Sequence, residues 1–99
     1  MAAKLILAPE AEQDLDEAYA WYERRRIGLG EDLLSRVDAC IQTIRRMPTM
    51  HRMVHKQYRR GLVRQFPYAI FYQYTNKTVT VYAVMHTARD PKKWRERLP

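Results

Sequence analysis

The sequence has little cysteine, glycine or proline and no long hydrophobic run, and each shortage excludes a class of protein. The single cysteine, Cys40, cannot form an intramolecular disulfide, which fits a reducing compartment. No apolar run approaches the roughly 20 residues that span a bilayer, and Met1–Leu7 is far shorter than the apolar core of a secretory signal. With three glycines, five prolines and 46% hydrophobic residues, the chain is neither disordered nor of low complexity. We therefore expect a single cytoplasmic domain over residues 1–99, with no membrane partner.

Acidic residues are scarce after residue 40. Residues 1–40 carry nine acids and five basic residues, a net charge of −4, whereas residues 41–99 carry two acids and thirteen basic residues, a net charge of +11. A basic surface of this kind favours a polyanion or an acidic protein segment as partner. The charge alone leaves open a generally basic surface that is merely solvated.

The densest run of β-branched and aromatic residues is Tyr58–Met85, which is interrupted at Phe66-Pro67 and at Thr75–Lys77. These interruptions have hairpin spacing, so the run predicts a three-stranded antiparallel meander. An earlier apolar run, Lys4–Ala8, predicts a further buried strand whose partner strand stays open. In the last strand, alternation assigns four residues to the core face, namely Val79, Val81, Ala83 and Met85.

Two amphipathic helices are expected between the first strand and the meander. The first begins at Pro9, ends near Arg26 and is joined to the second through Gly28–Gly30, and Pro48 ends the second. They are expected to pack as a hairpin on one face of the sheet. The segment Thr49–Gln57 shows neither period and is predicted to be a loop.

A short terminal helical turn is predicted from Asp90 as N-cap and Pro91 at the first position. Its spacing turns Trp94 and Leu98 inward. Four basic residues are expected to point outward: Lys92, Lys93, Arg95 and Arg97. The predicted fold class is thus α+β, in the order β-α-α-β-β-β followed by this turn, with a mainly antiparallel, twisted sheet.

The residue types limit the chemistry. There is no glycine-rich phosphate loop and no recognisable Ser or Cys nucleophile. His51 and His55 are four residues apart, but no Cys, Asp or Glu lies in that segment to complete a site, so we expect no metal, and we expect no cofactor. Arginines bind phosphate and a histidine can move a proton, so the remaining set can bind or cleave a nucleic-acid backbone: Arg59, Arg60, Arg64, His86 and Arg89. Residue types favour binding, because catalysis requires a geometry that spacing does not reveal.

The order of elements and five short motifs resemble the RelE/ParE toxin superfamily of bacterial type II toxin–antitoxin modules, over nearly the whole chain. The motifs are Ala11-Glu12-Gln13-Asp14-Leu15, Trp21-Tyr22-Glu23, Gly28-Leu29-Gly30, Phe66-Pro67-Tyr68 leading to Tyr72, and Val84-Met85-His86-Thr87-Ala88-Arg89-Asp90-Pro91. The resemblance implies a small basic toxin that a cognate antitoxin wraps and neutralises, in a hetero-oligomer that reaches operator DNA only through the antitoxin.

The resemblance also bears on the target. Ribosome-dependent mRNA endonucleases of the RelE and YoeB type carry an arginine at the position of Ala69, whereas His86 and Asp90 followed by a basic tail look more like ParE, whose members inhibit DNA gyrase. We therefore expect a gyrase inhibitor that is not an enzyme. Its contacts with antitoxin or target are expected at Arg59, Arg60, Arg64, His86, Arg89 and Trp94.

Two alternatives stay open. One is an mRNA endonuclease acting with the ribosome, whose catalytic residues would be Arg60, Arg64, His86 and Arg89. The other is a degenerate, non-toxic protein that retains only antitoxin binding.

Overall fold

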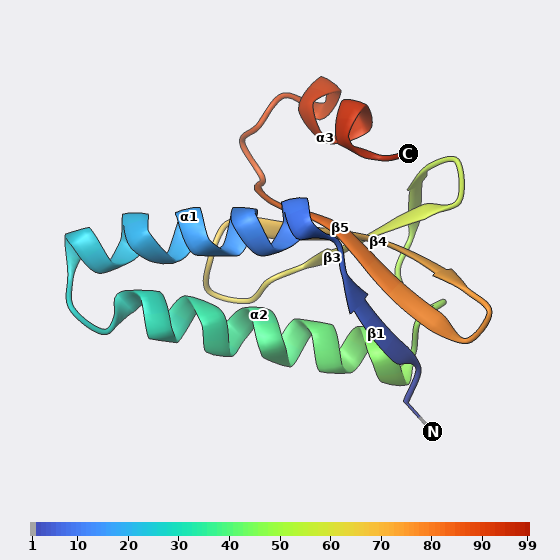
Figure 1. Ribbon diagram of the computed structural model, residues 1–99, viewed down its shortest axis with the longest axis horizontal. Coiled ribbons are helices and arrows are strands. Elements are labelled where there is room, and N and C mark those ends of the chain that lie inside the picture. Colours follow the sequence, from blue (N-terminus) through green and yellow to red (C-terminus); the bar gives the residue numbers. More distant parts are fainter. Residues whose placement is uncertain (1) are drawn as a thin grey trace.

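The helices and strands lie largely where the apolar periods predict them. The computed structural model describes residues 2–99, so Met1, the first residue of the predicted domain, lies outside the described part. The elements in chain order are β1 (Lys4–Leu7), α1 (Pro9–Arg25), α2 (Leu29–Arg46), β2 (Met53–His55), β3 (Tyr58–Leu62), β4 (Tyr68–Thr75), β5 (Thr78–His86) and α3 (Pro91–Arg97) (Figure 1). The predicted α+β class is confirmed, with one strand more than expected. Within residues 2–99, the helices are too short or too polar to cross a membrane.

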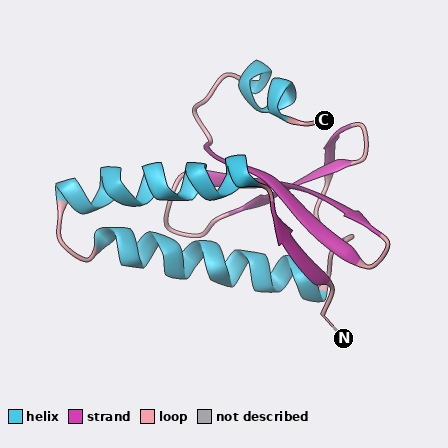
Figure 2. Ribbon diagram, in the orientation of Figure 1, coloured by secondary structure: helices cyan, strands magenta, loops and turns pink. Residues whose placement is uncertain are grey.

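The strands form one mixed sheet in the order β1-β5-β4-β3-β2. The pairs β2–β3, β3–β4 and β4–β5 are antiparallel. β1 runs parallel to β5, with Lys4 opposite Thr78 and Leu7 opposite Val81. The α1–α2 hairpin covers one face, as predicted, and α3 packs on the other (Figure 2). We call these the hairpin face and the α3 face.

The prediction of a loop over Thr49–Gln57 is wrong at Met53–His55, which forms β2 at the edge of the sheet. β2 has three residues, its register with β3 shifts between Met53 and His55, and Lys56 in the following turn has a φ of 50°. A strand so short and irregular has no detectable apolar alternation. Only its pairing with β3 identifies it.

A β-bulge at Tyr82 corrects the predicted core face of β5. Adjacent residues of β4 pair with Val81 and with Ala83, so Tyr82 is an extra residue in β5. The extra residue reverses the alternation beyond it. Val81 and Val84 therefore pack on the hairpin face, whereas Ala83 and Met85 pack on the α3 face.

The core on the hairpin face is built mainly from α2 and the central strands. Four residues of α2 at helical spacing are at most 4% exposed: Leu33, Val37, Ile41 and Ile44. Tyr72 of β4 is fully buried against this core, and its hydroxyl donates a hydrogen bond to the Pro48 carbonyl over 2.8 Å. Burial disfavours the charged phenolate and raises the pKa of Tyr72 to about 12, so the hydroxyl remains a donor.

His51 lies beside this core. Its ring meets Tyr72 edge to face, with 6.2 Å between ring centroids, and its Nε2 atom is buried without a hydrogen-bond partner in residues 2–99. Burial, followed by the positive charge of Arg59, lowers the pKa of His51 below its ordinary value of 6.5. The folded state therefore favours the neutral imidazole.

The second core lies between α3 and the sheet. Trp94 stacks on Phe71 of β4 at 4.7 Å between ring centroids, and Leu98 is buried in the same cluster. The Asp90 side chain accepts from the Lys92 amide over 3.0 Å. The predicted N-cap and the inward positions of Trp94 and Leu98 are thus confirmed.

The turn between α1 and α2 is fixed by Glu23. Its Oε1 atom accepts from the amides of Gly28 and Gly30, each over 2.8 Å. Amides in the first turn of a helix have no intrahelical acceptor, so this carboxylate caps α2 from the neighbouring helix. A Cβ at position 30 would lie 2.7 Å from side-chain carbons of Glu23 and Tyr19, which explains the need for glycine there.

Asp14 of α1 joins α1, β5 and α3. Its Oδ2 atom accepts from the Val84 amide over 2.9 Å and from one Arg97 guanidinium nitrogen over 2.8 Å, and its Oδ1 atom accepts from the other over 3.1 Å. The prediction that Arg97 points outward is therefore wrong. A carboxylate from the neighbouring helix, which the spacing within α3 does not reveal, draws this arginine onto the fold.

Replacing Asp14 with alanine is expected to lower the free energy of unfolding by about 2–4 kcal/mol, because it leaves the Val84 amide and the half-buried Arg97 without their acceptor. Asp16→Ala, on the exposed side of α1, is the matched control and should change stability by less than about 0.5 kcal/mol. Urea unfolding measures both. Equal effects of the two variants, or no coupling in a double-mutant cycle with Arg97→Met, would contradict this role.

The lowered pKa of His51 predicts a loss of stability in mild acid. Above the unfolded-state value of 6.5 both states hold a neutral His51, so this residue adds no pH dependence. As the pH falls through 6.5, the unfolded state binds a proton that the folded state disfavours, and stability falls until the lower folded pKa is reached. His51→Gln should therefore lose less stability than the unchanged protein between pH 7.5 and pH 5, as followed by urea unfolding. Parallel pH profiles would refute this prediction.

Candidate functional site

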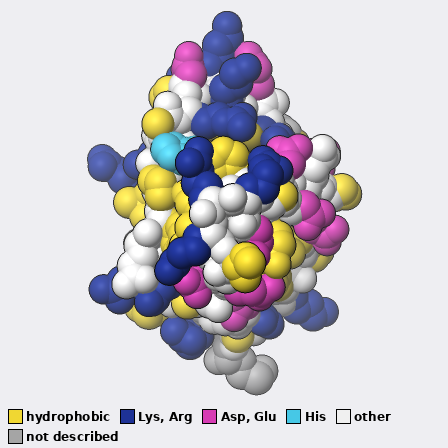
Figure 3. All heavy atoms as spheres, turned by 90° about the vertical axis from the view of Figure 1, so that its left-hand side faces the viewer, with side chains coloured by type: hydrophobic (Ala, Val, Ile, Leu, Met, Phe, Trp, Pro, Cys, Tyr) yellow, Lys and Arg dark blue, Asp and Glu magenta, His cyan; other side chains and the backbone are white. Residues whose placement is uncertain are grey.

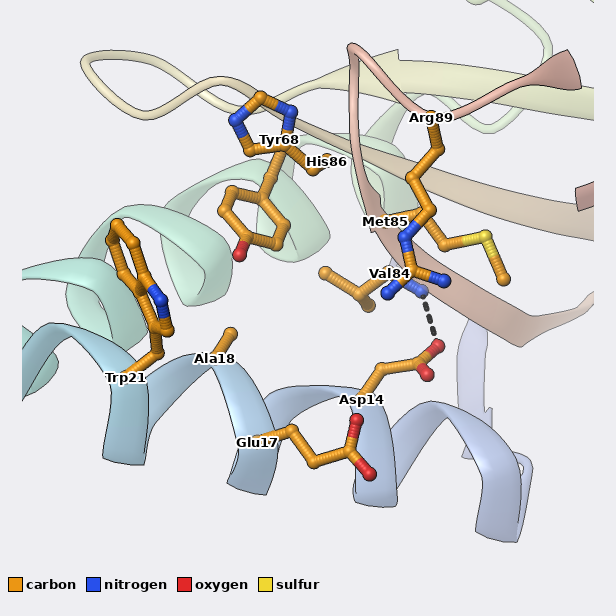
Figure 4. Close-up of a pocket in the computed structure, with 9 residues that line it drawn as sticks. All are labelled: Asp14, Glu17, Ala18, Trp21, Tyr68, Val84, Met85, His86 and Arg89. Atoms are coloured by element: carbon orange, nitrogen blue, oxygen red, sulfur yellow. Dashed lines mark hydrogen bonds between the residues drawn. The ribbon is translucent and has the colours of Figure 1, made fainter. Parts of the chain in front are cut away.

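A hollow of about 350 Å³ lies between α1 and the C-terminal end of β5. It is lined by nine residues: Asp14, Glu17, Ala18, Trp21, Tyr68, Val84, Met85, His86 and Arg89 (Figure 4). Two of them, His86 and Arg89, belong to the set predicted from the sequence. We call this hollow the α1–β5 pocket.

The helical repeat of α1 supplies one wall of the pocket. The pocket residues of α1 lie on one side of the helix. Counted from Asp14, they follow after three, four and seven residues, at Glu17, Ala18 and Trp21. Ala18 is 5% exposed, and its small side chain allows close approach to the sheet. Trp21 stands at the outer end of this wall, where the Arg25 guanidinium lies 3.7 Å from its ring centroid.

The opposite wall is a cross-strand pair of rings. Tyr68 of β4 is directly opposite His86 of β5, with 5.5 Å between ring centroids. The His86 Nδ1 atom accepts a hydrogen bond from the Ala88 amide over 3.0 Å. This contact orients the ring and assigns the remaining donor position to Nε2.

Tyr68 and Arg89 set the electrostatics of the pocket. Burial, with a smaller contribution from Tyr22, raises the pKa of Tyr68, while Arg89 acts in the opposite direction. The phenol is therefore protonated at neutral pH and acts as a hydrogen-bonding group, not as a base. Figure 4 shows the Arg89 side chain extending from the loop after β5 toward the α1 side of the pocket. The pocket thus offers one guanidinium and one imidazole, together with the carboxylates of Asp14 and Glu17.

Of the four residues of the nuclease alternative, His86 and Arg89 share the α1–β5 pocket, and Arg60 and Arg64 lie elsewhere. Residues directly opposite each other in an antiparallel pair share a face of the sheet. Arg60 is opposite Phe71, which packs on the α3 face, whereas His86 is opposite Tyr68, which packs toward the hairpin. Arg60 and His86 therefore lie on opposite faces of the sheet, and the pocket contains neither Arg60 nor Arg64.

Arg59 and Arg64 have different surroundings. The Arg59 guanidinium donates to the carbonyls of Thr49 and His51 over 3.2 and 2.7 Å, which fastens the segment before β2 to β3. Arg64 is exposed and lines a separate hollow with residues of α2. Arg59 thus has a structural use, whereas Arg64 stands free of hydrogen-bond and ion-pair partners within residues 2–99.

Trp94 is 7% exposed because it stacks on Phe71. The sequence predicts a partner contact at Trp94, and in the fold its ring holds α3 on the sheet.

Metal ligands do not gather in the described residues. Within residues 2–99 there is no group of three or more His, Cys, Asp or Glu side chains that could hold a metal ion. The rings of His51 and His55 separate, since His51 meets Tyr72 on the hairpin side and His55 meets Trp94 on the α3 side.

Four polar or aromatic residues of the α1–β5 pocket are absent from the site predicted from the sequence: Asp14, Glu17, Trp21 and Tyr68. The spacing of Asp14, Glu17 and Trp21 could have indicated a shared surface, because they form a second stripe on α1 beside the apolar one. Assigning that stripe to a site required the position of β5 relative to α1. That position comes from packing and not from a local period.

The comparisons with known proteins agree with this fold. The model of the ParE toxin of type II toxin–antitoxin systems, parDE, matches residues 5–91. The structure is similar to a chain of the chromosomal ParDE TA system from P. aeruginosa, with a TM-score of 0.77 and 11% identity, covering 86% of this chain and 96% of that chain. No curated protein matches the sequence.

At 11% identity the structural likeness establishes the fold alone. The family model covers most of the sequence, from the first strand to the start of α3. The chain therefore belongs to the ParE toxin family of type II toxin–antitoxin systems.

Proposed function

We propose that this chain inhibits growth by binding DNA gyrase, performs no chemistry itself and is neutralised by a cognate protein antitoxin in the cytoplasm. Membership of the ParE family supports an antitoxin partner. The choice of gyrase follows the resemblance of His86 and Asp90, with the basic tail after them, to the ParE branch.

The observation that carries the proposal is the separation of the cleavage residues. Phosphodiester cleavage requires the phosphate-binding arginine and the proton-transferring histidine within hydrogen-bond reach of one scissile group. Arg60 and His86 lie on opposite faces of the sheet, so Arg60 does not meet this requirement. Arg89 lines the α1–β5 pocket together with His86, but the carboxylates of Asp14 and Glu17 line the same pocket and disfavour a phosphate there. Ala69, at the position of the endonucleases' arginine, is 2% exposed within the α3-side core, where a charged side chain would lack solvent.

The surface suits a macromolecular partner. Figure 3 shows basic side chains spread over the end of the molecule at the α1–α2 turn, with hydrophobic and acidic side chains exposed between them. Ile27 in that turn is 92% exposed. Exposed apolar groups among positive charges can combine unscreened apolar contact with electrostatic attraction to a partner.

A direct test compares two activities of the purified chain, made by cell-free synthesis to avoid toxicity. We expect it to prevent DNA gyrase from supercoiling relaxed plasmid and to leave mRNA intact on programmed ribosomes. Cleaved mRNA with normal supercoiling would replace the proposal with the endonuclease alternative. A folded chain inactive in both assays, whose expression leaves growth unaffected, would indicate the degenerate antitoxin-binding alternative.

His86→Ala provides a second test, because a gyrase inhibitor needs no proton-transferring imidazole. We expect the variant to retain most of its gyrase inhibition and growth inhibition. Its fold is checked by circular dichroism and urea unfolding. Complete loss of toxicity in a folded variant would favour a catalytic His86 and count against the proposal.

A further inference from the structure

Acidic and basic side chains lie in different layers of this protein. Nine of the eleven acids belong to α1 and α2, the helices on the hairpin face, where they outnumber five basic residues. The other two acids are Asp90 and Glu96, and the Asp90 side chain is already engaged as the N-cap of α3. The layer of α3 on the opposite face of the sheet therefore has little negative charge of its own.

α3 is held on the sheet by its inward residues. The Trp94 ring stacks on the sheet, and Arg97 is held by the carboxylate of Asp14. The Tyr58 hydroxyl also donates a hydrogen bond to a backbone oxygen of Pro99 over 2.7 Å, which ties the residues after α3 to β3. The outward side chains of α3 thus stand on a fixed base, so a partner bound by them pays little to order the helix.

Four basic side chains lie around α3. Lys92 and Arg95 are three residues apart and share a side of the helix, with Lys93 next to them. The His55 ring of β2 meets the Trp94 ring, with 6.3 Å between ring centroids, and this contact brings the turn after β2 beside α3 (Figure 1). That turn begins with an exposed lysine. We call the following residues the α3 basic surface: Lys56, Lys92, Lys93 and Arg95.

The charges of the α3 basic surface are not neutralised by folding. All four residues are exposed, and within residues 2–99 their side chains have no hydrogen-bond or ion-pair partner. The Arg95 guanidinium lies 5.4 Å from the ring centroid of Trp94, which leaves its N–H groups free to bind an anion. Three of the four residues also lie beyond residues 5–91, which the family model matches.

We propose that the α3 basic surface binds the phosphate backbone of duplex DNA without sequence preference. Lysine and arginine side chains that contact phosphates release the counterions condensed on DNA, and this release drives binding. α3 is about 10 Å long, a length over which each strand of a duplex presents about three phosphates. Contacts with phosphate carry no sequence information, so this surface does not select an operator.

Burial of the aromatic rings favours a duplex over a single strand. Proteins that bind single-stranded nucleic acid stack its bases on exposed aromatic side chains. The rings beneath α3 belong to Trp94, Phe71 and Tyr58, and each is at most 7% exposed. An acidic protein segment would gain most from apolar anchors, but Leu98 and Trp94 of this region are buried in the core. A duplex backbone is the partner that charge alone can hold.

The choice of DNA over duplex RNA rests on the proposed function, because a chain bound to gyrase lies next to the duplex that the enzyme holds. The separation of charge also orients the bound chain. Attraction at the α3 layer and repulsion at the acidic hairpin layer turn α1 and α2 away from the phosphates.

The test measures the fluorescence anisotropy of a labelled DNA duplex of about 20 base pairs with the full chain, at salt concentrations from about 50 to about 200 mM. We expect equal affinity for two duplexes of unrelated sequence and weaker binding of a single strand. With about four phosphate contacts, the plot of log K against log salt should have a slope of about −3 to −4.

Variants locate the contact. Lys92→Gln combined with Lys93→Gln should make the slope shallower by about two and weaken binding at low salt by about tenfold or more. Arg24→Gln combined with Arg36→Gln is the matched control, because it removes the same charge from exposed positions of the helical hairpin. The control should change the slope by less than about half a unit. Circular dichroism checks that both variants are folded.

Several results would overturn the inference. Equal slopes for the two double variants would show a generally basic chain without a surface for DNA. Tighter binding of a single strand, of duplex RNA or of a poly-glutamate peptide of equal charge would assign the surface to another partner. Gyrase inhibition without duplex binding would reject this inference alone, whereas duplex binding without gyrase inhibition would reject the proposed target alone.

Discussion

The carboxylate of Asp14 determines how three separate elements meet. β1 ends at Leu7, so β5 has an uncovered edge at Val84, and the Asp14 side chain accepts the amide there as a neighbouring strand would. The same carboxylate holds Arg97 in a two-bond contact and thereby fixes α3 relative to α1. It is largely buried, with 12% of its side chain exposed, so both contacts are protected from water. Without Asp14, no single polar side chain would connect α1 to both β5 and α3 within residues 2–99.

Acidic and basic side chains have different roles in this molecule. Acids of the first helix satisfy buried or terminal backbone groups, with Asp14 on the Val84 amide and Glu23 on the amides that begin α2. Many arginines of the later half have no acid nearby and remain exposed around β3. Much of the positive charge is therefore not paired with acidic side chains in the folded chain. It is available to a partner, which is consistent with a protein that acts by binding.

The bulge at Tyr82 decides which residues share a face. By reversing the alternation of β5, it places Val84 and His86 toward the hairpin and Ala83 and Met85 toward α3. The α1–α2 hairpin and α3 cover the two faces of the sheet, with Tyr68 and His86 beside α1 and Arg60 on the other side. A regular β5 would have placed His86 on the opposite face. The separation of Arg60 from His86, which supports the proposal of a binding protein, thus depends on one extra residue in a strand.

The sequence by itself determined the helical hairpin, the meander, the cap at Asp90 and the inward Trp94, because each depends on a local period or on capping chemistry. It also placed His86 and Arg89 together, since they lie close in the chain. Only the tertiary structure decided the short strand β2, the reversal at Tyr82, the parallel pairing of β1 with β5 and the contact between Asp14 and Arg97. These features join segments up to 83 residues apart, and their energy comes from pairing and burial between elements, which a local pattern does not contain.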